Sequence, residues 1–424
     1  MLTWEAEQVL RRYRPKVVAV TGSVGKTSTK DAIAHVLSTH HRLRKSQKSF
    51  NSEIGVPLTV LGLENAWTNP FKWVWNVLQG LWLVYVPHTY PDLLVLEVGA
   101  DHPGDIERTA KWLRPDVAVV TWVGETPAHV EFYDSPKALA HEKAALIRAL
   151  TKDGVCILNY DDPVVQGMMH DTRGHVTGYG YSPKAHLLIS NPHIQYQKEG
   201  DREAPVGMAF RVDYKGHMIP IELRGACGGQ AIYAATAAFA VASELGVPLL
   251  EITELLKTYV GPPGRMRLLS GIKGSILIDD TYNSSPAAVS SAFAFLKEAK
   301  APNRGRKIAV LGDMLELGKY TVEAHKAVGF EVAHTANFLF AVGTRARFIA
   351  EAARLEGMKA DKIFVFDDAM AAGRALDPLL KKGDIALIKG SQFMRMERVV
   401  LEVMAHPEDA DRLLVRQESE WMNR

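Results

Sequence analysis

A glycine loop near the start of the chain combines residue types that bind phosphate. The segment Thr21-Gly22-Ser23-Val24-Gly25-Lys26-Thr27-Ser28 lies between a short β-branched run, 17–20, and a stretch with apolar residues at helical spacing. Glycines let backbone N–H groups surround a phosphate, the start of a helix adds positive charge, and Lys26 reaches the outer phosphates. The Thr27 hydroxyl would then ligate Mg²⁺. The segment departs from the full P-loop pattern at Val20, where that pattern has glycine. We expect these loop residues to bind a nucleoside triphosphate, namely Gly22, Ser23, Gly25, Lys26, Thr27 and Ser28.

Two residues that follow predicted strands carry side chains suited to metal ligation. Glu97 lies near the end of the apolar run 93–98, and His129 follows the run 117–121 after a turn at Gly124. The carboxyl ends of parallel strands meet at the edge of a sheet where ligands bind, and Mg²⁺ prefers carboxylate oxygens. Taken singly, Glu97 could be a solvent-exposed strand end and His129 a structural histidine. Together they predict a metal site beside the glycine loop.

Strand and helix patterns alternate along most of the chain and predict an α/β fold. The runs 93–98, 117–121 and 155–159 have helical patterns nearby, which indicates a mostly parallel sheet covered on both faces. Residues 187–223 alternate polar and apolar positions, as in an antiparallel edge region. After the break at Gly261-Pro262-Pro263-Gly264, five further strand candidates alternate with helices: 275–278, 307–311, 338–342, 363–366 and 385–388. We therefore predict a P-loop-type central domain, 1–262, and a Rossmann-like, doubly wound C-terminal domain, 263–424.

The overall composition is that of an ordinary globular protein. The 424 residues include 50 Lys plus Arg against 48 Asp plus Glu, so the net charge is +2, and nucleic acid is not the expected partner. The two cysteines have no metal-type spacing and fit a reducing compartment. The first residues lack the apolar core of a signal peptide, and no apolar run reaches spanning length. We expect a cytoplasmic protein.

Several segments spread over almost the whole chain resemble the Mur ligase family. Within that family they are most similar to the branch that adds D-alanyl-D-alanine to a UDP-muramoyl tripeptide. The matching segments are 21–27, Phe50-Asn51-Ser52-Glu53-Ile54-Gly55-Val56-Pro57, Glu97-Val98-Gly99-Ala100, Ala128-His129-Val130-Glu131, 158–163, Gly264-Arg265, Ile278-Asp279-Asp280-Thr281-Tyr282-Asn283-Ser284-Ser285-Pro286, Leu311-Gly312-Asp313-Met314-Leu315-Glu316-Leu317-Gly318 and Lys389-Gly390-Ser391.

The resemblance implies an ATP- and Mg²⁺-dependent, ADP-forming ligase that activates a carboxylate as an acyl phosphate and joins it to an amine. Lys26 would bind the ATP phosphates, and the metal ligands would be Thr27, Glu97, His129 and Lys143. Lys143 matches the family lysine that becomes carbamylated; without the resemblance it would be a surface lysine on a helix. Arg265 and Asp280 would reach the nucleotide. The remaining matched positions would contact substrate, namely Asn51, Tyr282, Asn283, Asp313 and Lys389.

Three features depart from the family pattern. The glycine loop begins at Thr21, whereas the family normally carries a separate domain for the uridine nucleotide before it. The acyl substrate is therefore either a cell-wall precursor peptide or an acceptor without a UDP handle, of a polyglutamate, folate or lipid-linked kind. The family segment Gly-x-His-Asn-x-x-Asn-Ala corresponds to 228–235, where both asparagines are alanine and the histidine is Gln230.

An aromatic insertion, 65–90, is the third departure. Between Trp67 and Tyr85 it holds four tryptophans, a phenylalanine and a tyrosine interleaved with leucine and valine. Aromatic rings of this kind suit an amphipathic helix at a membrane interface, where a lipid-linked substrate could be received. We favour the alternative of a helix pair packed on the core or in a dimer contact.

Overall fold

The computed structural model describes residues 1–47, 50–100, 102–124, 133, 135–172, 174–199, 202–418 and 421. The chain divides into two compact units. The first comprises residues 1–192, 210–221 and 232–258, and the second comprises residues 193–209, 222–231 and 259–424. The division of the chain into domains at 262/263 stays a prediction.

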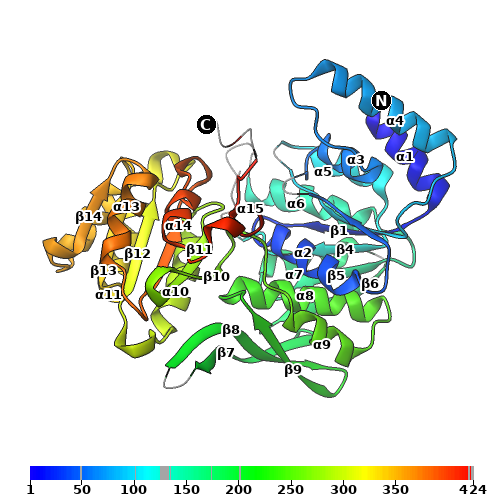
Figure 1. The fold of residues 1–424 in the computed structure, drawn as a ribbon. Coiled ribbons are helices and arrows are strands. Elements are labelled where there is room, and N and C mark those ends of the chain that lie inside the picture. The colour runs from blue at the N-terminus through cyan, green and yellow to red at the C-terminus, as the bar shows by residue number, and fades with distance from the viewer. Residues whose placement is uncertain are drawn as a thin grey trace. The chain divides into compact units, whose positions relative to one another are not determined.

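A nine-stranded sheet has the order β2-β3-β1-β4-β5-β6-β7-β8-β9 (Figure 1). Its strands are β1 (Lys16–Thr21), β2 (Leu43–Lys45), β3 (Leu93–Glu97), β4 (Val117–Val120), β5 (Val155–Asn159), β6 (His175–Gly180), β7 (Leu187–Glu199), β8 (Arg202–Tyr214) and β9 (His217–Arg224). The pairs from β2 to β7 are parallel. β8 and β9 are joined at Lys215-Gly216, both with positive φ, which is the geometry of a tight hairpin and confirms the antiparallel edge region.

Helices of the first unit cover both faces of the parallel strands. They are α1 (Leu2–Tyr13), α2 (Lys26–Leu37), α3 (Gly55–Leu61), α4 (Pro70–Tyr85), α5 (Asp105–Leu113), α6 (Pro136–Arg148), α7 (Pro163–Gly167) and α9 (Leu249–Lys257), with α8 (Gly229–Glu244) beginning in the second unit. One core cluster joins Ala19 and Leu96 of the sheet to residues of α1, α3, α5 and α6. The neighbouring strand residues Val18, Val20 and Val95 are fully buried on the opposite face, because successive strand residues point to opposite sides.

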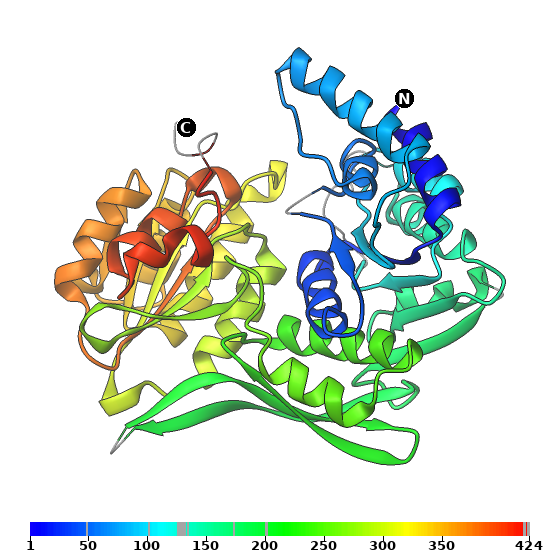
Figure 2. The same ribbon diagram turned by 45° about the vertical axis from the view of Figure 1, so that its right-hand side comes forward.

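The second unit contains a six-stranded sheet of order β10-β11-β15-β12-β13-β14 (Figures 1 and 2). Its strands are β10 (Arg267–Ser270), β11 (Ile276–Asp280), β12 (Lys307–Gly312), β13 (Phe338–Val342), β14 (Ile363–Phe366) and β15 (Ile385–Lys389). All pairs are parallel except β10 with β11. The five predicted strands are present, and β10 is an edge strand that the sequence analysis did not predict.

Helices also cover both faces of this second sheet. They are α10 (Pro286–Glu298), α11 (Thr321–Thr335), α12 (Arg347–Leu355), α13 (Ala369–Leu379), α14 (Glu397–Val403) and α15 (Ala410–Leu413). Phe340 and Ile388 share one core cluster with α13 and α14, while Leu339 and Leu387 are buried on the other face. The α/β fold class, with a mostly parallel sheet followed by a doubly wound one, is confirmed.

The aromatic insertion forms a single helix, α4, rather than a helix pair. Its buried residues are Asn76, Gly80 and Val84, whereas most of its aromatic side chains are exposed. The expectation of a helix pair packed on the core is therefore wrong, because the face of α4 that contacts the protein is the one with small and polar residues. The alternative of a dimer contact stays a prediction. No helix among the described residues is long and apolar enough to cross a bilayer.

Candidate active site

The glycine loop connects β1 to α2, as predicted. Gly22 has φ 143°, and a Cβ atom there would lie 2.1 Å from the Thr121 hydroxyl oxygen. Gly25 has φ 86° and caps the start of α2, a conformation that favours glycine. Val20 still belongs to β1, where it pairs with Glu97 of β3 and Val119 of β4. The loop therefore needs glycine at its two turning points, whereas position 20 is an ordinary strand position.

Backbone contacts hold the glycine loop against the end of β4. The N–H groups of Ser23 and Val24 donate to the Trp122 carbonyl oxygen at 2.6 and 3.1 Å. The Thr121 hydroxyl donates to the Val24 carbonyl oxygen at 2.7 Å. Lys26 begins α2, and its ammonium donates to the Gly22 carbonyl oxygen at 3.0 Å. A cation and a helix start thus meet at one loop, which is an arrangement that binds anions.

Glu97 lies at the end of β3 with its carboxylate next to this loop. The side chain is 2% exposed. The Thr27 hydroxyl donates to Oε2 at 2.9 Å and the Asn51 amide nitrogen donates to Oε1 at 3.3 Å. Because a buried carboxylate is costly without partners, these two donors stabilise its charge and set its orientation.

Gly99 allows Asn51 to reach this carboxylate. The Gly99 N–H donates to the Asn51 carbonyl oxygen at 2.8 Å, and a Cβ atom on Gly99 would lie 2.8 Å from the Asn51 side-chain nitrogen. The two motifs 50–57 and 97–100, which are separate in sequence, therefore form one structural feature. Its result is an amide and a carboxylate in contact beside the glycine loop.

Lys143 of α6 reaches the same loop from the other side. Its side chain is buried, and Nζ donates to the Gly22 carbonyl oxygen at 3.1 Å. The preceding residue, Glu142, accepts the backbone N–H groups of Gly104, Ile106 and Glu107 at 2.7–3.1 Å, at the start of α5. A carboxylate is favourable at a helix start, so this contact fixes α6 and with it Lys143. The sequence analysis did not single out Glu142, because one glutamate on a helix carries no recognisable signal.

The predicted metal site is described only in part. His129 lies outside the described residues. Within the described residues, no group of three or more His, Cys, Asp and Glu side chains is placed to hold a metal ion. The Thr27 hydroxyl and the Glu97 carboxylate are nevertheless hard oxygen donors in contact. This donor set fits Mg²⁺, which commonly takes one or two protein ligands and completes its shell with phosphate and water.

In the second unit, Asp280 and Lys389 form a buried ion pair. They are register partners on the neighbouring strands β11 and β15, and Lys389 Nζ lies 2.6 Å from Asp280 Oδ2. Lys389 also donates to the Asn283 carbonyl oxygen at 2.9 Å, and the Met266 N–H donates to Asp280 Oδ1 at 3.2 Å. The pair thus joins two strand ends to the loop that carries Tyr282 and Asn283.

Two arginines from distant segments lie close to the Tyr282 ring. The Arg265 guanidinium lies 3.9 Å from the ring centroid. Arg416 lies 5.7 Å from the same ring and donates to the carbonyl oxygens of Thr281 and Tyr282. Burial lowers the pKa of Arg416, while its contact with Glu397 at 3.0 Å opposes that shift. The C-terminal segment therefore positions the loop at 281–283, a role that the sequence analysis missed because no local motif marks Arg416.

Asp313, at the end of β12, supports the loop before α12. Its Oδ1 accepts the N–H groups of Arg345 and Ala346 at 3.0 and 2.7 Å, and its carbonyl oxygen accepts the Ser391 N–H at 3.0 Å. A Cβ atom on Gly343 would lie 2.5 Å from the same carboxylate oxygen. The substrate role predicted for Asp313 stays a prediction, since these contacts show a positioning role.

The structure thus gathers the predicted residues into two groups. The first unit brings together Gly22, Ser23, Gly25, Lys26, Thr27, Ser28, Asn51, Glu97 and Lys143. The second unit holds Arg265, Asp280, Tyr282, Asn283, Asp313 and Lys389. Within each group the contacts given above link residues that are far apart in sequence.

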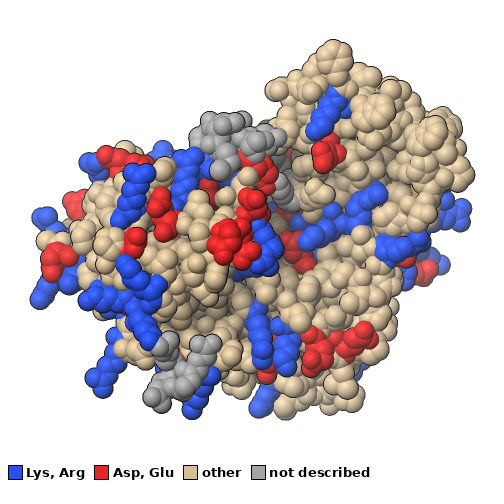
Figure 3. Space-filling model, in the orientation of Figure 1, with Lys and Arg blue, Asp and Glu red and all other residues tan. Residues whose placement is uncertain are grey.

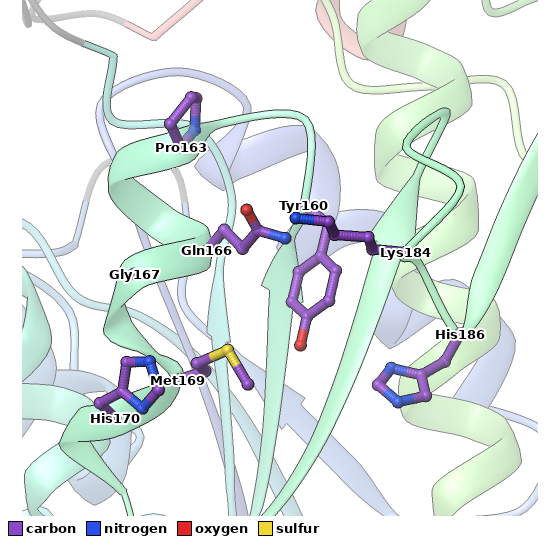
Figure 4. Close-up of a pocket in the computed structure, with 8 residues that line it drawn as sticks. All are labelled: Tyr160, Pro163, Gln166, Gly167, Met169, His170, Lys184 and His186. Atoms are coloured by element: carbon purple, nitrogen blue, oxygen red, sulfur yellow. The ribbon is translucent and has the colours of Figure 1, made fainter.

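A separate pocket of about 500 Å³ in the first unit contains none of the predicted residues (Figure 4). It is lined by Tyr160, Pro163, Gln166, Gly167, Met169, His170, Lys184 and His186. In Figure 4 the Tyr160 ring stands between α7 and the segment with Lys184 and His186. No described contact connects this pocket to the glycine loop, and we assign it no role.

Two known domains match the chain over most of its length. Residues 20–71 and 81–242 match the Mur ligase middle domain, and residues 264–392 match the Mur ligase glutamate ligase domain. The chain belongs to the Mur ligase family. The resemblance predicted from the motifs is thereby confirmed, and the two groups of site residues fall in the two matched domains.

Mur ligases that match most of this chain share one enzyme name. UDP-N-acetylmuramoyl-tripeptide–D-alanyl-D-alanine ligase of Bacillus subtilis is 29% identical over 95% of this chain and 79% of its own length. The enzyme of that name from Mycobacterium tuberculosis strain H37Rv is 30% identical over 88% of this chain and 70% of its own length. The Escherichia coli enzyme of that name is 28% identical over 94% of this chain and 78% of its own length.

Solved Mur ligase structures share the fold. The MurF ligase of Thermotoga maritima, determined in complex with ADP, superimposes with a TM-score of 0.74 at 25% identity, covering 95% of this chain and 82% of that one. MurF of Acinetobacter baumannii gives a TM-score of 0.76 at 24% identity, covering 95% and 79%. This Mur ligase is accordingly an ATP-dependent, ADP-forming ligase.

Proposed function

We propose that this Mur ligase joins D-alanyl-D-alanine to the terminal carboxylate of a UDP-N-acetylmuramoyl tripeptide, in the cytoplasm and with an acyl phosphate as intermediate. The observation that carries the proposal is the contact between Thr27 and Glu97 at the glycine loop. A hydroxyl and a carboxylate in contact beside this loop would suit the outer phosphates of a nucleotide and the Mg²⁺ bound to them. The proposed substrates are those in the name that these relatives share, and the relatives match almost the whole chain.

The glycine loop and the first turn of α2 would hold ATP. Gly22, Ser23 and Gly25 shape the loop, while Lys26, Thr27 and Ser28 stand at the helix start, where phosphate is favoured. Thr27 and Glu97 would hold Mg²⁺, and His129 and Lys143, the latter once carbamylated, are proposed as further ligands. When bound, Mg²⁺ supplies positive charge that neutralises the phosphates during transfer.

The chemistry needs positioning and charge neutralisation rather than a covalent enzyme nucleophile. A carboxylate oxygen of the tripeptide forms a bond to the γ-phosphorus as the bond to ADP breaks. The free amine of the dipeptide then attacks the acyl carbon, phosphate leaves, and the amine loses a proton. Lys26 would neutralise phosphate charge, and Asn51, which contacts Glu97, would contact the acyl substrate.

The second unit would contribute the remaining contacts. Arg265 and Asp280 are proposed to contact the nucleotide, with Arg265 held over the Tyr282 ring. Tyr282, Asn283, Asp313 and Lys389 are proposed to form the side where the amine binds. The ion pair of Lys389 with Asp280 and the contacts of Asp313 would keep this side rigid before substrate arrives.

Product mass spectrometry tests the proposal directly. The purified protein is incubated with ATP, UDP-N-acetylmuramoyl tripeptide and D-alanyl-D-alanine, and we expect the pentapeptide product together with ADP. Lys26→Met should abolish its formation, whereas Lys111→Met, an exposed lysine on α5, should leave it unchanged. Product formed only with a polyglutamate, folate or lipid-linked acceptor would keep the ligase chemistry and overturn the proposed acyl substrate.

A further inference from the structure

The helix α4 exposes a continuous apolar face. More than half of the surface of each of six side chains is exposed, from 52% for Leu78 to 85% for Phe71. We call these six residues the aromatic stripe: Phe71, Val74, Trp75, Leu78, Trp82 and Tyr85. At about 100° per residue they fall within an arc roughly 100° wide along the whole helix. Lys72 and Gln79 lie beside this arc. A continuous exposed stripe of six apolar side chains is unusual on a monomeric protein.

The opposite face of α4 is firmly attached to the rest of the unit. Asn69 caps the helix, and the Asn76 amide donates to the Glu64 carbonyl oxygen at 2.8 Å. Gly80 meets Glu5 of α1, where a Cβ atom would lie 2.0 Å from a carboxylate oxygen. Figures 1 and 2 both show α4 lying alongside α1. The orientation that exposes the aromatic stripe is therefore set by specific contacts. Within the stripe, the Trp82 ring N–H donates to His88 Nε2 at 2.8 Å, and the Trp82 side chain still stays largely exposed.

The end of α1 adds positive charge beside the end of α4. The Arg12 guanidinium donates to the Val84 carbonyl oxygen, and the Tyr13 hydroxyl lies 3.1 and 3.2 Å from the carbonyl oxygens of Leu83 and Val86. Residues 11–16 contain four exposed basic residues and no acidic one; we call them the basic cluster, namely Arg11, Arg12, Arg14 and Lys16. Glu7 pairs with Arg11 at 2.6 Å and offsets part of this charge. Figure 3 shows few charged side chains over the lobe that α4 forms.

The matched Mur ligase domain does not account for this helix. The match to the middle domain is interrupted between residues 71 and 81, inside α4, and begins at residue 20, after α1. None of the nine site residues of the first unit lies on α1 or α4. The aromatic stripe is thus a feature that the ligase reaction does not require.

We propose that α4 binds flat on the surface of an anionic lipid bilayer. Tryptophan and tyrosine rings favour the boundary between headgroups and acyl chains, and an in-plane helix buries one apolar stripe there. The adjacent basic cluster complements anionic headgroups, each basic residue strengthening binding about fivefold. A helix of 16 residues is too short and insufficiently apolar to span the bilayer, which fits binding at the surface. The charge complementarity favours lipid over a second copy of the chain, which would present the same basic cluster.

Vesicle co-sedimentation of the full chain tests this proposal. We expect binding to vesicles of phosphatidylcholine with 30% phosphatidylglycerol, weakening at high salt, and weaker binding to phosphatidylcholine alone. The variant W75E/W82E should lose binding at least tenfold, and the variant R11Q/R14Q should lose the preference for anionic lipid. The matched control, Phe330→Glu, replaces an exposed aromatic residue on α11 and should bind like the parent protein.

Two further measurements keep the test decisive. Ligation of soluble substrates by W75E/W82E should equal that of the parent, which shows that the variant is folded and separates this proposal from the proposed function. Sedimentation velocity without lipid should show a monomer. Absence of binding to anionic vesicles would overturn the proposal, as would a parent dimer that W75E/W82E dissociates, since the stripe would then bind a second copy.

Discussion

The Thr27 hydroxyl donates a 2.9 Å hydrogen bond to the Glu97 carboxylate, joining the first turn of α2 to the end of β3. The two residues are 70 positions apart in sequence, and adjacency of β1 and β3 brings them together. Because the hydroxyl and the carboxylate are already in contact, the two side chains would need little rearrangement when a metal–phosphate group binds. The contact links the predicted nucleotide loop to the predicted metal site.

Glu97→Gln should lower ligation by about two orders of magnitude or more while leaving the protein folded. The amide keeps the size of the side chain but loses the negative charge proposed to hold Mg²⁺. Phosphate release measured over a range of Mg²⁺ concentrations checks this, with a higher Mg²⁺ requirement expected for the variant. Glu107→Gln, on the exposed side of α5, is the control. Parent-like activity at low Mg²⁺ would remove Glu97 from the metal site.

Lys143→Ala should also severely reduce ligation, and short-chain carboxylic acids should restore part of it. The truncation leaves space beside the Gly22 carbonyl oxygen that a small carboxylate can enter, replacing the carbamate that the family resemblance implies. Turnover is measured with increasing acetate or formate. Lys137→Ala, exposed on the same helix, controls for general effects of the acids. Unchanged turnover in the Lys143 variant would refute its assigned role.

Lys389→Met should destabilise the second unit by about 3–5 kcal/mol, because it leaves the Asp280 carboxylate buried without its cation. Urea unfolding followed by fluorescence measures the change. The double variant D280N/K389M should recover much of the lost stability, since it removes both charges, whereas the exposed Lys382→Met should be neutral. If Asp280→Asn and Lys389→Met each leave the stability unchanged, the ion pair does not stabilise the fold.

Glu5→Met should stabilise the first unit at neutral pH by roughly 1–3 kcal/mol, because both Glu5 carboxylate oxygens are buried without a hydrogen-bond partner among the described residues. Burial raises the pKa of Glu5 above 4.5, so the folded state keeps a proton that the unfolded chain has already lost. The parent protein therefore loses stability as the pH rises from about 4.5 through the raised pKa. Thermal unfolding between pH 4 and 8 should show the benefit of the variant growing with pH. Glu7→Met on the same helix should show no such rise.

Local patterns were sufficient to predict the site elements of the first unit. The glycine loop lies between strand and helix because a β-branched run, two glycines and a helical pattern each specify their own local geometry. The same reasoning predicted five strands of the second unit but not β10, since Arg267–Ser270 is a short run that forms a strand only by pairing with β11. The packing of α4 was mispredicted because apolar periodicity shows that a helix has an apolar face, not which face is covered.

The sequence by itself determined the α/β fold class, the phosphate-binding loop and the family, because these depend on residue types at short spacing and on motifs long enough to be specific. Only the tertiary structure decided which distant residues meet: Asn51 with Glu97, Lys143 with Gly22, Lys389 with Asp280, and Arg416 with Tyr282. The reason is that strand order and helix packing arise from burial of the whole chain's apolar surface, which no single segment encodes. The exposed stripe of α4 follows from the same cause, since Gly80 packs against Glu5 of α1 and Asn76 binds the Glu64 carbonyl oxygen, which leaves most of the aromatic side chains outside.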